Sequence, residues 1–323
     1  MRTSSSFSRI LCLPVRDTDG IVVSWRALSF FFALIACAGD APPRDAESAA
    51  IEVVDDIGHT VRLPRPAERV VSLIPGRTDV ILALRAEDRL VARTRYDEDP
   101  RIAHLPSLGD ALTPSVEWLA LQEPDLVIAW PDRQSRSVVT RLEELGIPVY
   151  SSGVESIAGA RSSIADIGKL LGLQTRADSI ISRLDAVLDS VGSAHSAGDH
   201  PSVLYLIGLE PPQAAGPGTF IDEMIAVAGG TNALSDAAAL WPSVSIEDVL
   251  ARQPDVVIVS TATESVQQIL ANLRTRPGWR TLSAVRDNRV HVVDAGLMNR
   301  PGPALIDAVR ILAEAIHSKQ AVR

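Results

Sequence analysis

Five side chains that bear aromatic rings or guanidinium groups lie just after predicted strands or in loops beside predicted elements. They are Arg77, Tyr96, Trp130, Trp241 and Arg300. Rings offer flat apolar surfaces on which an unsaturated ligand can stack, and guanidinium groups pair with phosphate or carboxylate. Because ligands of open parallel sheets bind outside the carboxyl ends of the strands, these positions indicate a binding site. The alternative is structural: the tryptophans would fill a core or a gap, and the arginines would be solvated or cap helices.

A partial internal repeat carries a pair of acids. Residues 115–128 read SVEWLALQEPDLVI and residues 245–258 read SIEDVLARQPDVVI, with six identities in fourteen positions. Glu117 and Glu247 occupy equivalent positions in the first turn of a predicted short helix, where a carboxylate complements the helix dipole. Local capping, together with a coincidental match of two helix-then-strand units, is one interpretation. Two equivalent acids on matched halves would also suit docking onto a two-fold symmetric partner that carries arginines.

The sequence contains none of the common signatures of enzymes. No G-x-S-x-G elbow, Gly-rich phosphate loop or H-E-x-x-H motif occurs, and the six histidines are scattered without ligand spacing. We therefore expect no catalytic residues, no metal site and no cofactor, although His59 and His104 could meet in three dimensions as ligands. A net charge of −9 and a pI near 5.2 argue against a nucleic-acid-binding protein, which would present a basic face.

The N-terminal region is typical of a targeting segment. Arg26 precedes an apolar run over residues 27–36, which is too short to span a bilayer of ~30 Å but fits the core of a signal peptide. The run ends in LIAC, which resembles a bacterial lipobox and implies cleavage before Cys37 and acylation of its sulfur. The alternative is an ordinary secretory signal or a buried apolar segment. The residues further upstream are unusual for a signal, so we expect translation to start at Val22 or Val23.

The elements that position these residues are strands that alternate with helices, which predicts parallel sheets covered on both faces. Between the two copies of the repeat, residues 174–191 carry an apolar stripe at steps of three and four, with no Pro or Gly inside. At ~1.5 Å per residue such a helix spans roughly 27 Å, enough to bridge two lobes. The predicted fold class is α/β, with two Rossmann-like lobes joined by one long rigid α-helix.

The chain divides accordingly into five segments. They are a lipoprotein signal peptide over 1–37, a flexible tether over 38–50, an N-terminal α/β lobe over 51–173, the linking helix over 174–195 and a C-terminal α/β lobe over 196–323. The tether is small, polar and proline-containing, as flexible linkers are. Since Cys12 and Cys37 are the only cysteines, we expect the processed chain to have no disulfide.

Several stretches together resemble the bacterial ABC-importer substrate-binding proteins of the iron–siderophore and cobalamin group, and most closely its cobalamin-binding members. The stretches are RVVSLIP (69–75), SVEWLALQEPDLVIAW (115–130), LEELGIPVY (142–150), AVAGGTNALSD (226–236), WPSVSIEDVLARQPDVVIVS (241–260) and RPGPALIDA (300–308). The resemblance covers roughly residues 50–318. It implies a single-helix hinge, a ligand site between the lobes, and one acid on each lobe, here Glu117 and Glu247, that docks with arginines of a permease dimer.

The resemblance also implies a ligand. In the cobalamin-binding members aromatic residues sandwich the corrin, and the matching positions here are Tyr96 and Trp241, while Trp130 matches a further tryptophan. The chain departs from those members at Leu108 and Gln213, where they carry aromatic residues. These departures leave a ferric siderophore or haem as the alternative ligand.

We therefore expect a monomeric lipoprotein of the periplasm or cell envelope, held at the membrane by a lipid anchor, that binds cobalamin or another metal chelate and delivers it to an ABC permease dimer. It would be neither an enzyme nor a nucleic-acid-binding protein. An enzyme on a related two-lobed scaffold would need a catalytic cluster in the cleft, and a structural or adhesive lipoprotein would lack rings and arginines there. Because a linking helix resists bending, we expect small lobe motion on binding.

Overall fold

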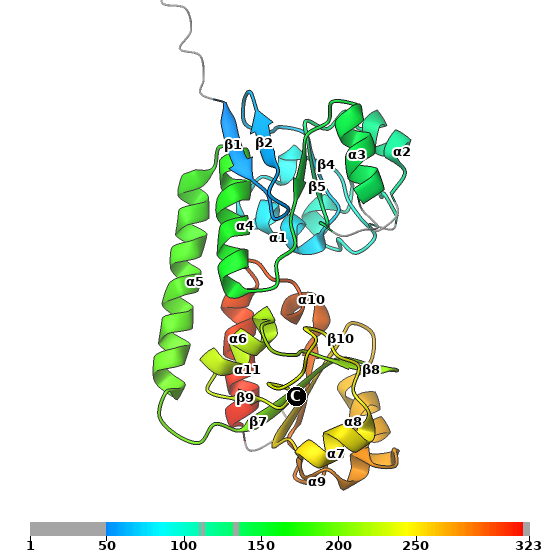
Figure 1. Ribbon diagram of the computed structural model, residues 1–323, viewed down its shortest axis with the longest axis vertical. Coiled ribbons are helices and arrows are strands. Elements are labelled where there is room, and N and C mark those ends of the chain that lie inside the picture. The colour runs from blue at the N-terminus through cyan, green and yellow to red at the C-terminus, as the bar shows by residue number, and fades with distance from the viewer. Residues whose placement is uncertain (1–49, 110, 112–113, 132–135, 319–323) are drawn as a thin grey trace, which may run out of the picture. The chain divides into compact units, whose positions relative to one another are not determined.

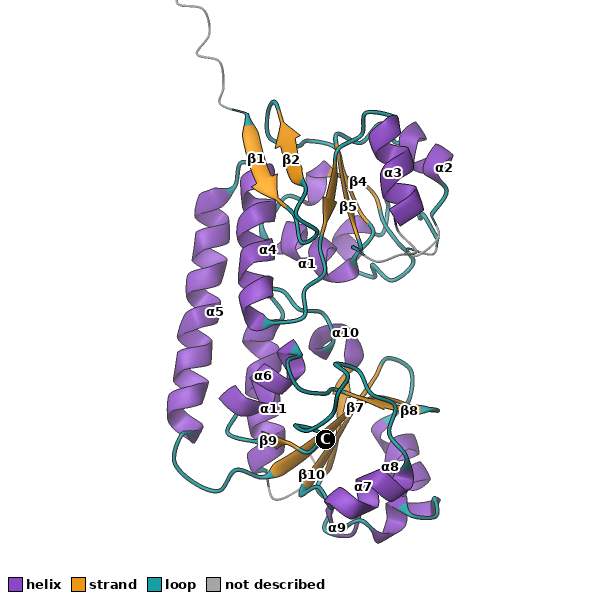
Figure 2. Cartoon of the chain, viewed as in Figure 1, coloured by secondary structure: helices purple, strands orange, loops and turns teal. Residues whose placement is uncertain are grey.

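The computed structural model describes residues 50–109, 111, 114–131 and 136–318, which form two α/β lobes joined by a long helix (Figure 1). The fold class predicted from the sequence is confirmed, since each lobe contains a sheet with parallel strands (Figure 2). The expected signal peptide, the acylated Cys37 and nearly all of the tether lie outside the described residues. Within the described part of the chain, no helix combines the length and apolarity needed to cross a membrane.

The first lobe is built on a parallel sheet with strand order β4-β3-β5-β6. The sequence of residues 51–63 predicts a short hairpin, which is confirmed, with β1 and β2 antiparallel. Strand β5 is buried along its whole length, as expected of a strand covered on both faces. The elements are β1 (Ile51–Val54), β2 (Thr60–Leu63), β3 (Val70–Ser72), α1 (Pro75–Ala83), β4 (Leu90–Ala92), α2 (Val116–Leu121), β5 (Leu126–Ala129), α3 (Arg136–Glu144), β6 (Val149–Ser151) and α4 (Ile157–Leu170), with short 3₁₀ helices at Glu87–Arg89 and Pro100–Ile102.

Helix α1 begins earlier than the sequence indicated. The sequence indicates a helix that opens at Thr78 and Asp79, with one of them as its cap, because both residue types favour that position. In the structure the helix starts at Pro75, after Ile74, and no side chain caps it. Proline suits the first helical position because its fixed φ is helical and its missing N–H would have no partner there. The earlier start places Arg77 in the first turn, close to the carboxyl end of β3.

The second lobe has the strand order β11-β10-β7-β8, with β9 also beside β7. Strand β8 is antiparallel to β7, whereas the other described pairs of this sheet are parallel. Their content of proline and glycine predicts that residues 211–218 form a loop. This prediction is wrong in its first part, because β8 pairs there; a Pro at the first residue of an edge strand is tolerated. The elements are β7 (Ser202–Leu209), β8 (Pro212–Ala214), α6 (Phe220–Val227), β9 (Thr231–Asn232), α7 (Ile246–Arg252), β10 (Val256–Thr261), α8 (Val266–Thr275), α9 (Ser283–Arg286), β11 (Val290–Asp294), α10 (Ala295–Met298) and α11 (Leu305–His317), with a 3₁₀ helix at Trp279–Thr281.

Helix α5 (Gln174–His195) contributes to the cores of both lobes. Ala177, near its start, is buried in a core of the first lobe, where α5 packs on α4. Leu184 and Val191, further along, are buried in a core of the second lobe, where α5 packs on α11 and α6. The helix therefore links the lobes through buried apolar contacts at both of its halves.

Candidate functional site

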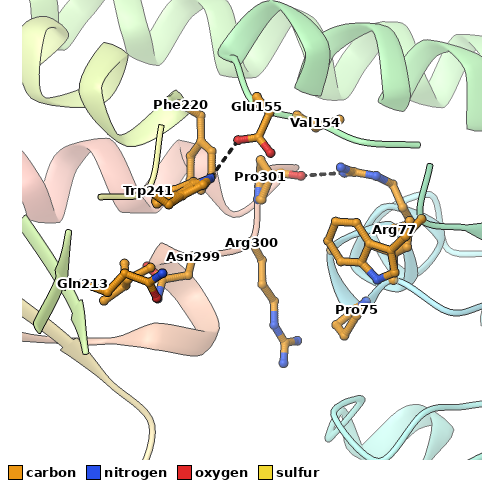
Figure 3. A pocket seen from close by; sticks show the side chains of 14 residues that line it. Pro75, Arg77, Val154, Glu155, Gln213, Phe220, Trp241, Asn299, Arg300 and Pro301 are labelled. Atoms are coloured by element: carbon orange, nitrogen blue, oxygen red, sulfur yellow. Dashed lines mark hydrogen bonds between the residues drawn. The ribbon is translucent and has the colours of Figure 1, made fainter. Parts of the chain in front are cut away.

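A cavity of about 510 Å³ lies between the two lobes (Figure 3). This volume is within the ~300–1,000 Å³ that is typical of small-molecule sites. Its walls come from the first turn of α1 and the residues after β5 and β6 in the first lobe, and from β7, β8, α6 and the segment after α10 in the second. Four of the five residues that the sequence placed in a ligand site line it together, namely Arg77, Trp130, Trp241 and Arg300.

The two tryptophans reach the cavity from opposite lobes. Trp130 directly follows β5 and also packs against a core of the first lobe. Trp241 lies in the loop before α7 and packs against a core of the second lobe, with its ring centroid 6.1 Å from that of Phe220. Both side chains are only partly buried. Each ring thus covers a core with one part and forms a wall of the cavity with another.

Arg77 is 1% exposed, although it lines the cavity. Its Nε donates to Ser152 Oγ at 3.0 Å, and its Nη1 donates across the cleft to the carbonyl oxygen of Pro301 at 2.6 Å. Burial lowers the pKa of Arg77 to about 10, so the guanidinium is still charged at neutral pH. The side chain expected to pair with a ligand therefore already has partners in both lobes.

Arg300 reaches from the second lobe to the first, opposite in direction to Arg77. Figure 3 shows it extending between Gln213 on one side and Pro75 on the other. Its Nη2 donates to the carbonyl oxygen of Tyr96 at 2.8 Å, and its Nη1 lies 3.5 Å from Asp79 Oδ2. Burial raises the pKa of Asp79, and the positive charge of Arg300 opposes that shift.

Tyr96 is the member of the predicted set that does not line the cavity. The residue is 46% exposed, and the guanidinium carbon of Arg95 lies 5.4 Å from the centre of its ring. Its contact with the cleft runs through its backbone, which accepts the hydrogen bond from Arg300. The structure therefore does not bring the Tyr96 ring to the two tryptophans.

The two repeat acids lie away from the cavity, on exposed first turns of α2 and α7. Figure 1 shows both helices on the parts of their lobes that are remote from α5. Glu117 Oε2 accepts a hydrogen bond from Ser115 Oγ at 3.0 Å. Its own backbone N–H and the Ser115 hydroxyl hold the pKa of Glu117 below its usual value. Local capping is thus present at Glu117.

Sequence reasoning missed Glu155, which lines the cavity from the loop after β6. Its Oε2 accepts a hydrogen bond from Trp241 Nε1 at 3.2 Å, which joins the lobes at the cavity wall (Figure 3). The signal was available, because the sequence predicts a strand over residues 147–151 and ligands bind beyond the carboxyl ends of such strands. Gln213 also lines the cavity, from β8, and was noted only as a departure from an aromatic residue.

Asn299 was missed for a different reason. It follows α10, a short helix that the sequence did not predict, and lines the cavity from there. Its Nδ2 donates to Ser260 Oγ at 2.9 Å and its Oδ1 accepts from the Tyr205 hydroxyl at 2.9 Å. No three or more His, Cys, Asp or Glu side chains are arranged to hold a metal ion in the part of the chain that the structure describes.

The cleft between two lobes that share a linking helix is the architecture of a known family. A family model described as periplasmic binding protein matches residues 70–297, which is most of the chain. The chain belongs to the periplasmic binding protein family. Members of this family are transport binding proteins and not enzymes, so this periplasmic binding protein is not an enzyme.

Two relatives of this periplasmic binding protein align over most of their own length. The vitamin B12-binding protein of Vibrio cholerae serotype O1 is 28% identical over 248 residues, covering 76% of this chain and 88% of the relative. The ABC transporter substrate-binding lipoprotein YvrC of Bacillus subtilis is 27% identical over 308 residues, covering 91% of this chain and 96% of the relative.

Solved structures share the two-lobed architecture. The periplasmic vitamin B12 binding protein BtuF of Vibrio cholerae aligns with a TM-score of 0.68 at 27% identity, covering 78% of this chain and 97% of that one. The periplasmic heme-binding protein RhuT of a Roseiflexus species, in its apo form, aligns with a TM-score of 0.68 at 27% identity, covering 78% and 100%. This periplasmic binding protein therefore has the same fold as these two structures, with α5 linking two parallel-sheet lobes.

Proposed function

We propose that this chain is the substrate-binding component of an ABC importer and captures cobalamin or a related metal chelate between its lobes. The observation that carries the proposal is the pair of Trp130 and Trp241, which reach one interlobe cavity from opposite lobes. Partly exposed rings on two walls suit a flat macrocyclic ligand, which can stack on both. Family membership supports a transport role, and the relatives named for vitamin B12 support this ligand class.

A ferric siderophore or haem is the second candidate. It is supported by the heme-binding protein RhuT, which is as similar to this chain as BtuF is. The chelated metal would arrive inside the ligand in either case, since the described residues offer no metal-binding cluster of their own. A lipid anchor at Cys37 and a place at the membrane in the periplasm or cell envelope are supported by the likeness to the lipoprotein YvrC over 91% of this chain.

Parallel calorimetric and fluorescence titrations of the processed protein with cyanocobalamin, a ferric hydroxamate siderophore and haemin test the ligand proposal. The true ligand should quench the fluorescence of Trp130 and Trp241, because it stacks on them. A Trp130→Phe, Trp241→Phe double variant should lose most of the quenching, whereas Trp118→Phe, on α2 and outside the cavity lining, should retain it. Absence of binding by all three chelates would contradict the proposal.

We also propose that Glu117 and Glu247 dock onto arginines of a permease dimer. Each acid is exposed and lies two residues after a serine that caps its helix, so the two lobes present the same charged turn. A Glu117→Ala, Glu247→Ala double variant should bind ligand as the wild type does and should lose uptake in cells. Asp178→Ala, Asp189→Ala on the exposed face of α5 removes the same charge elsewhere and should transport normally. Normal uptake by the Glu117, Glu247 variant would rule out the docking role.

A further inference from the structure

The charges that line the cavity are unequally available to a ligand. Among the residues that the structure describes, three ionisable side chains line it: Arg77, Glu155 and Arg300. Arg77 is 1% exposed and donates to Ser152 Oγ and to the Pro301 carbonyl, so a ligand in the cavity has little access to its charge.

Arg300 is more accessible, but its charge is compensated. Its Nη1 lies 3.5 Å from the carboxylate of Asp79, and its Nη2 donates to the Tyr96 carbonyl. Both members of this pair are mostly buried, with side chains 26% and 31% exposed, so solvent screens their attraction only in part. An anionic ligand at Arg300 would compete with Asp79 and would approach that carboxylate.

Glu155 is the accessible charge among the described side chains that line the cavity. The residue is exposed, and the hydrogen bond that its carboxylate accepts among the described residues comes from the indole N–H of Trp241, a neutral donor, at 3.2 Å. A neutral hydrogen bond leaves the full negative charge of the carboxylate in place. That charge lies beside one of the two rings on which the ligand would stack, so any ligand in the cavity comes close to it.

The remaining polar side chains of the cavity favour neutral groups. Asn299 is engaged by Ser260 and Tyr205. Gln213 is exposed on β8, and a carboxamide both donates and accepts hydrogen bonds. An amide on a ligand can both donate to Gln213 and accept from it. A carboxylate can only accept, and it is also repelled by the negative charge of Glu155.

We propose that Glu155 is a specificity-determining residue that selects, by charge, metal chelates with a neutral or cationic periphery over chelates that carry carboxylates or catecholates. This inference rests on the proposed function and narrows it to one class of chelate. Cyanocobalamin, with a periphery rich in amides, belongs to the accepted class, and haemin, with two propionates, to the disfavoured one. Repulsion between like charges in a partly desolvated cleft is expected to weaken haemin binding by about tenfold or more.

Glu155→Gln tests this role, because it removes the charge and keeps an oxygen that can accept from Trp241 Nε1. Calorimetric titration should show the wild type preferring cyanocobalamin, and Glu155→Gln should bind haemin about tenfold more tightly while cyanocobalamin affinity stays within about twofold. The gain for haemin should shrink as the salt concentration rises, which a purely steric change would not produce. Asp178→Asn on α5 makes the same change in net charge far from the cavity lining and should alter neither affinity.

Two kinds of result would overturn the proposal: one rejects only the charge selection, and the other also rejects the proposed function. If the chelates bind but Glu155→Gln leaves the preference unchanged, or if the wild type prefers haemin, the charge selection is wrong while the transport function stands. If cyanocobalamin, haemin and the ferric hydroxamate siderophore all fail to bind to the wild type and to the variant, the proposed function fails and the selection fails with it. An unchanged tryptophan emission maximum in Glu155→Gln shows that the rings, Trp241 among them, have kept their environment.

Discussion

Arg77 and Arg300 cross the space between the lobes in opposite directions. Arg77 reaches from α1 to the carbonyl oxygen of Pro301, and Arg300 reaches back to that of Tyr96. A hydrogen bond from a charged donor contributes about 1.5–3 kcal/mol, and the Arg77 bond lies out of reach of solvent screening because that side chain is 1% exposed. These two side chains therefore hold the cleft walls to one another in addition to any part they take in binding.

His291 gives the stability of the protein a dependence on pH. The side chain lies on β11 and is 1% exposed, and burial lowers its pKa to about 4, with the charge of Arg289 adding to the shift. In the unfolded chain a histidine titrates near 6.5, so between pH 6.5 and 4 the unfolded state binds a proton that the folded state does not. The free energy of unfolding should therefore be independent of this group above about pH 7 and fall below it, by at most ~1.4 kcal/mol per pH unit.

Urea unfolding at pH 7, 6 and 5 measures this effect. His291→Gln should lose part of the decrease in unfolding free energy between pH 7 and 5, since glutamine does not titrate. His104→Gln, at an exposed side chain, should keep the wild-type decrease. Equal pH slopes in the wild type and in His291→Gln would show that burial of this ring does not control the dependence.

The two tryptophans that line the cavity could be predicted from the sequence, whereas the ring of Phe220 and the roles of the charges could not. Trp130 was found because its place at the end of a strand is a local property of the sequence. Arg77 donates to the carbonyl oxygen of Pro301, which is 224 residues away in the sequence. No local sequence pattern predicts that these two residues lie close together. The place of Glu155 after a predicted strand could have identified it as a candidate. Its contact with Trp241 could not be predicted, because that contact forms only when the two lobes face each other.

At the scale of the elements, the internal repeat proves to be one structural unit present in each lobe, α2 followed by β5 and α7 followed by β10. Ser115 and Ser245 cap the two helices by accepting from the third backbone N–H that follows. Glu123 and Gln253, the equivalent residues after the helices, both have left-handed backbones, with φ of 47° and 43°. The like-for-like residues of the repeat thus reflect a shared helix–turn–strand geometry.

The aspartate of the repeated Pro-Asp pair has a common role in both lobes as well. Asp125 accepts from the backbone N–H of Arg69 at 2.9 Å, and Asp255 accepts from that of Ser202 at 2.8 Å. Each aspartate so fixes the start of the neighbouring strand, β3 or β7. The repeat could be read from the sequence because such local geometry demands particular residues, whereas β8 lacked any such signal because its pairing with β7 is tertiary.

A pair of glycines tests how α4 and α5 pack. A Cβ on Gly168 in α4 would lie 2.4 Å from Ala177 Cβ in α5, closer than real Cβ atoms approach. Gly168→Ala should therefore destabilise the protein by about 1–3 kcal/mol through overpacking. Gly192→Ala, within α5, would meet Val227 only at 4.0 Å and should stabilise by roughly 0.5–1 kcal/mol through helix propensity. Urea unfolding measures both, and shifts of the same sign would contradict this close approach of the two helices.

Across the whole of the described molecule, buried contacts and hydrogen bonds join the lobes in addition to the covalent chain. Helix α5 is buried in both lobes, and the start of α4 also reaches the second lobe, where the backbone N–H of Ile157 donates to Glu223 Oε2 at 2.6 Å. Bending the link would expose apolar surface at α5 and break this bond. A linking helix packed in this way limits opening more than a hinge of loops does, because a loop hinge needs only changes in a few backbone angles.

Small-angle scattering with and without saturating cyanocobalamin tests the stiffness of the link. We expect the two radii of gyration to agree within experimental error for the wild type. Ser182→Gly, Arg183→Gly on the exposed face of α5 weakens the helix by about 1 kcal/mol per glycine without removing buried contacts, and should produce a measurable contraction on binding.

Asp307→Gly, Arg310→Gly weakens α11 to a similar degree and serves as the control, because that helix lies within the second lobe and its two changed side chains are exposed. This variant should behave as the wild type does, since its helix does not connect the lobes. A contraction of the wild type as large as that of the α5 variant would mean that the lobes move freely about α5, and that neither the buried helix nor the crossing arginines restrain them.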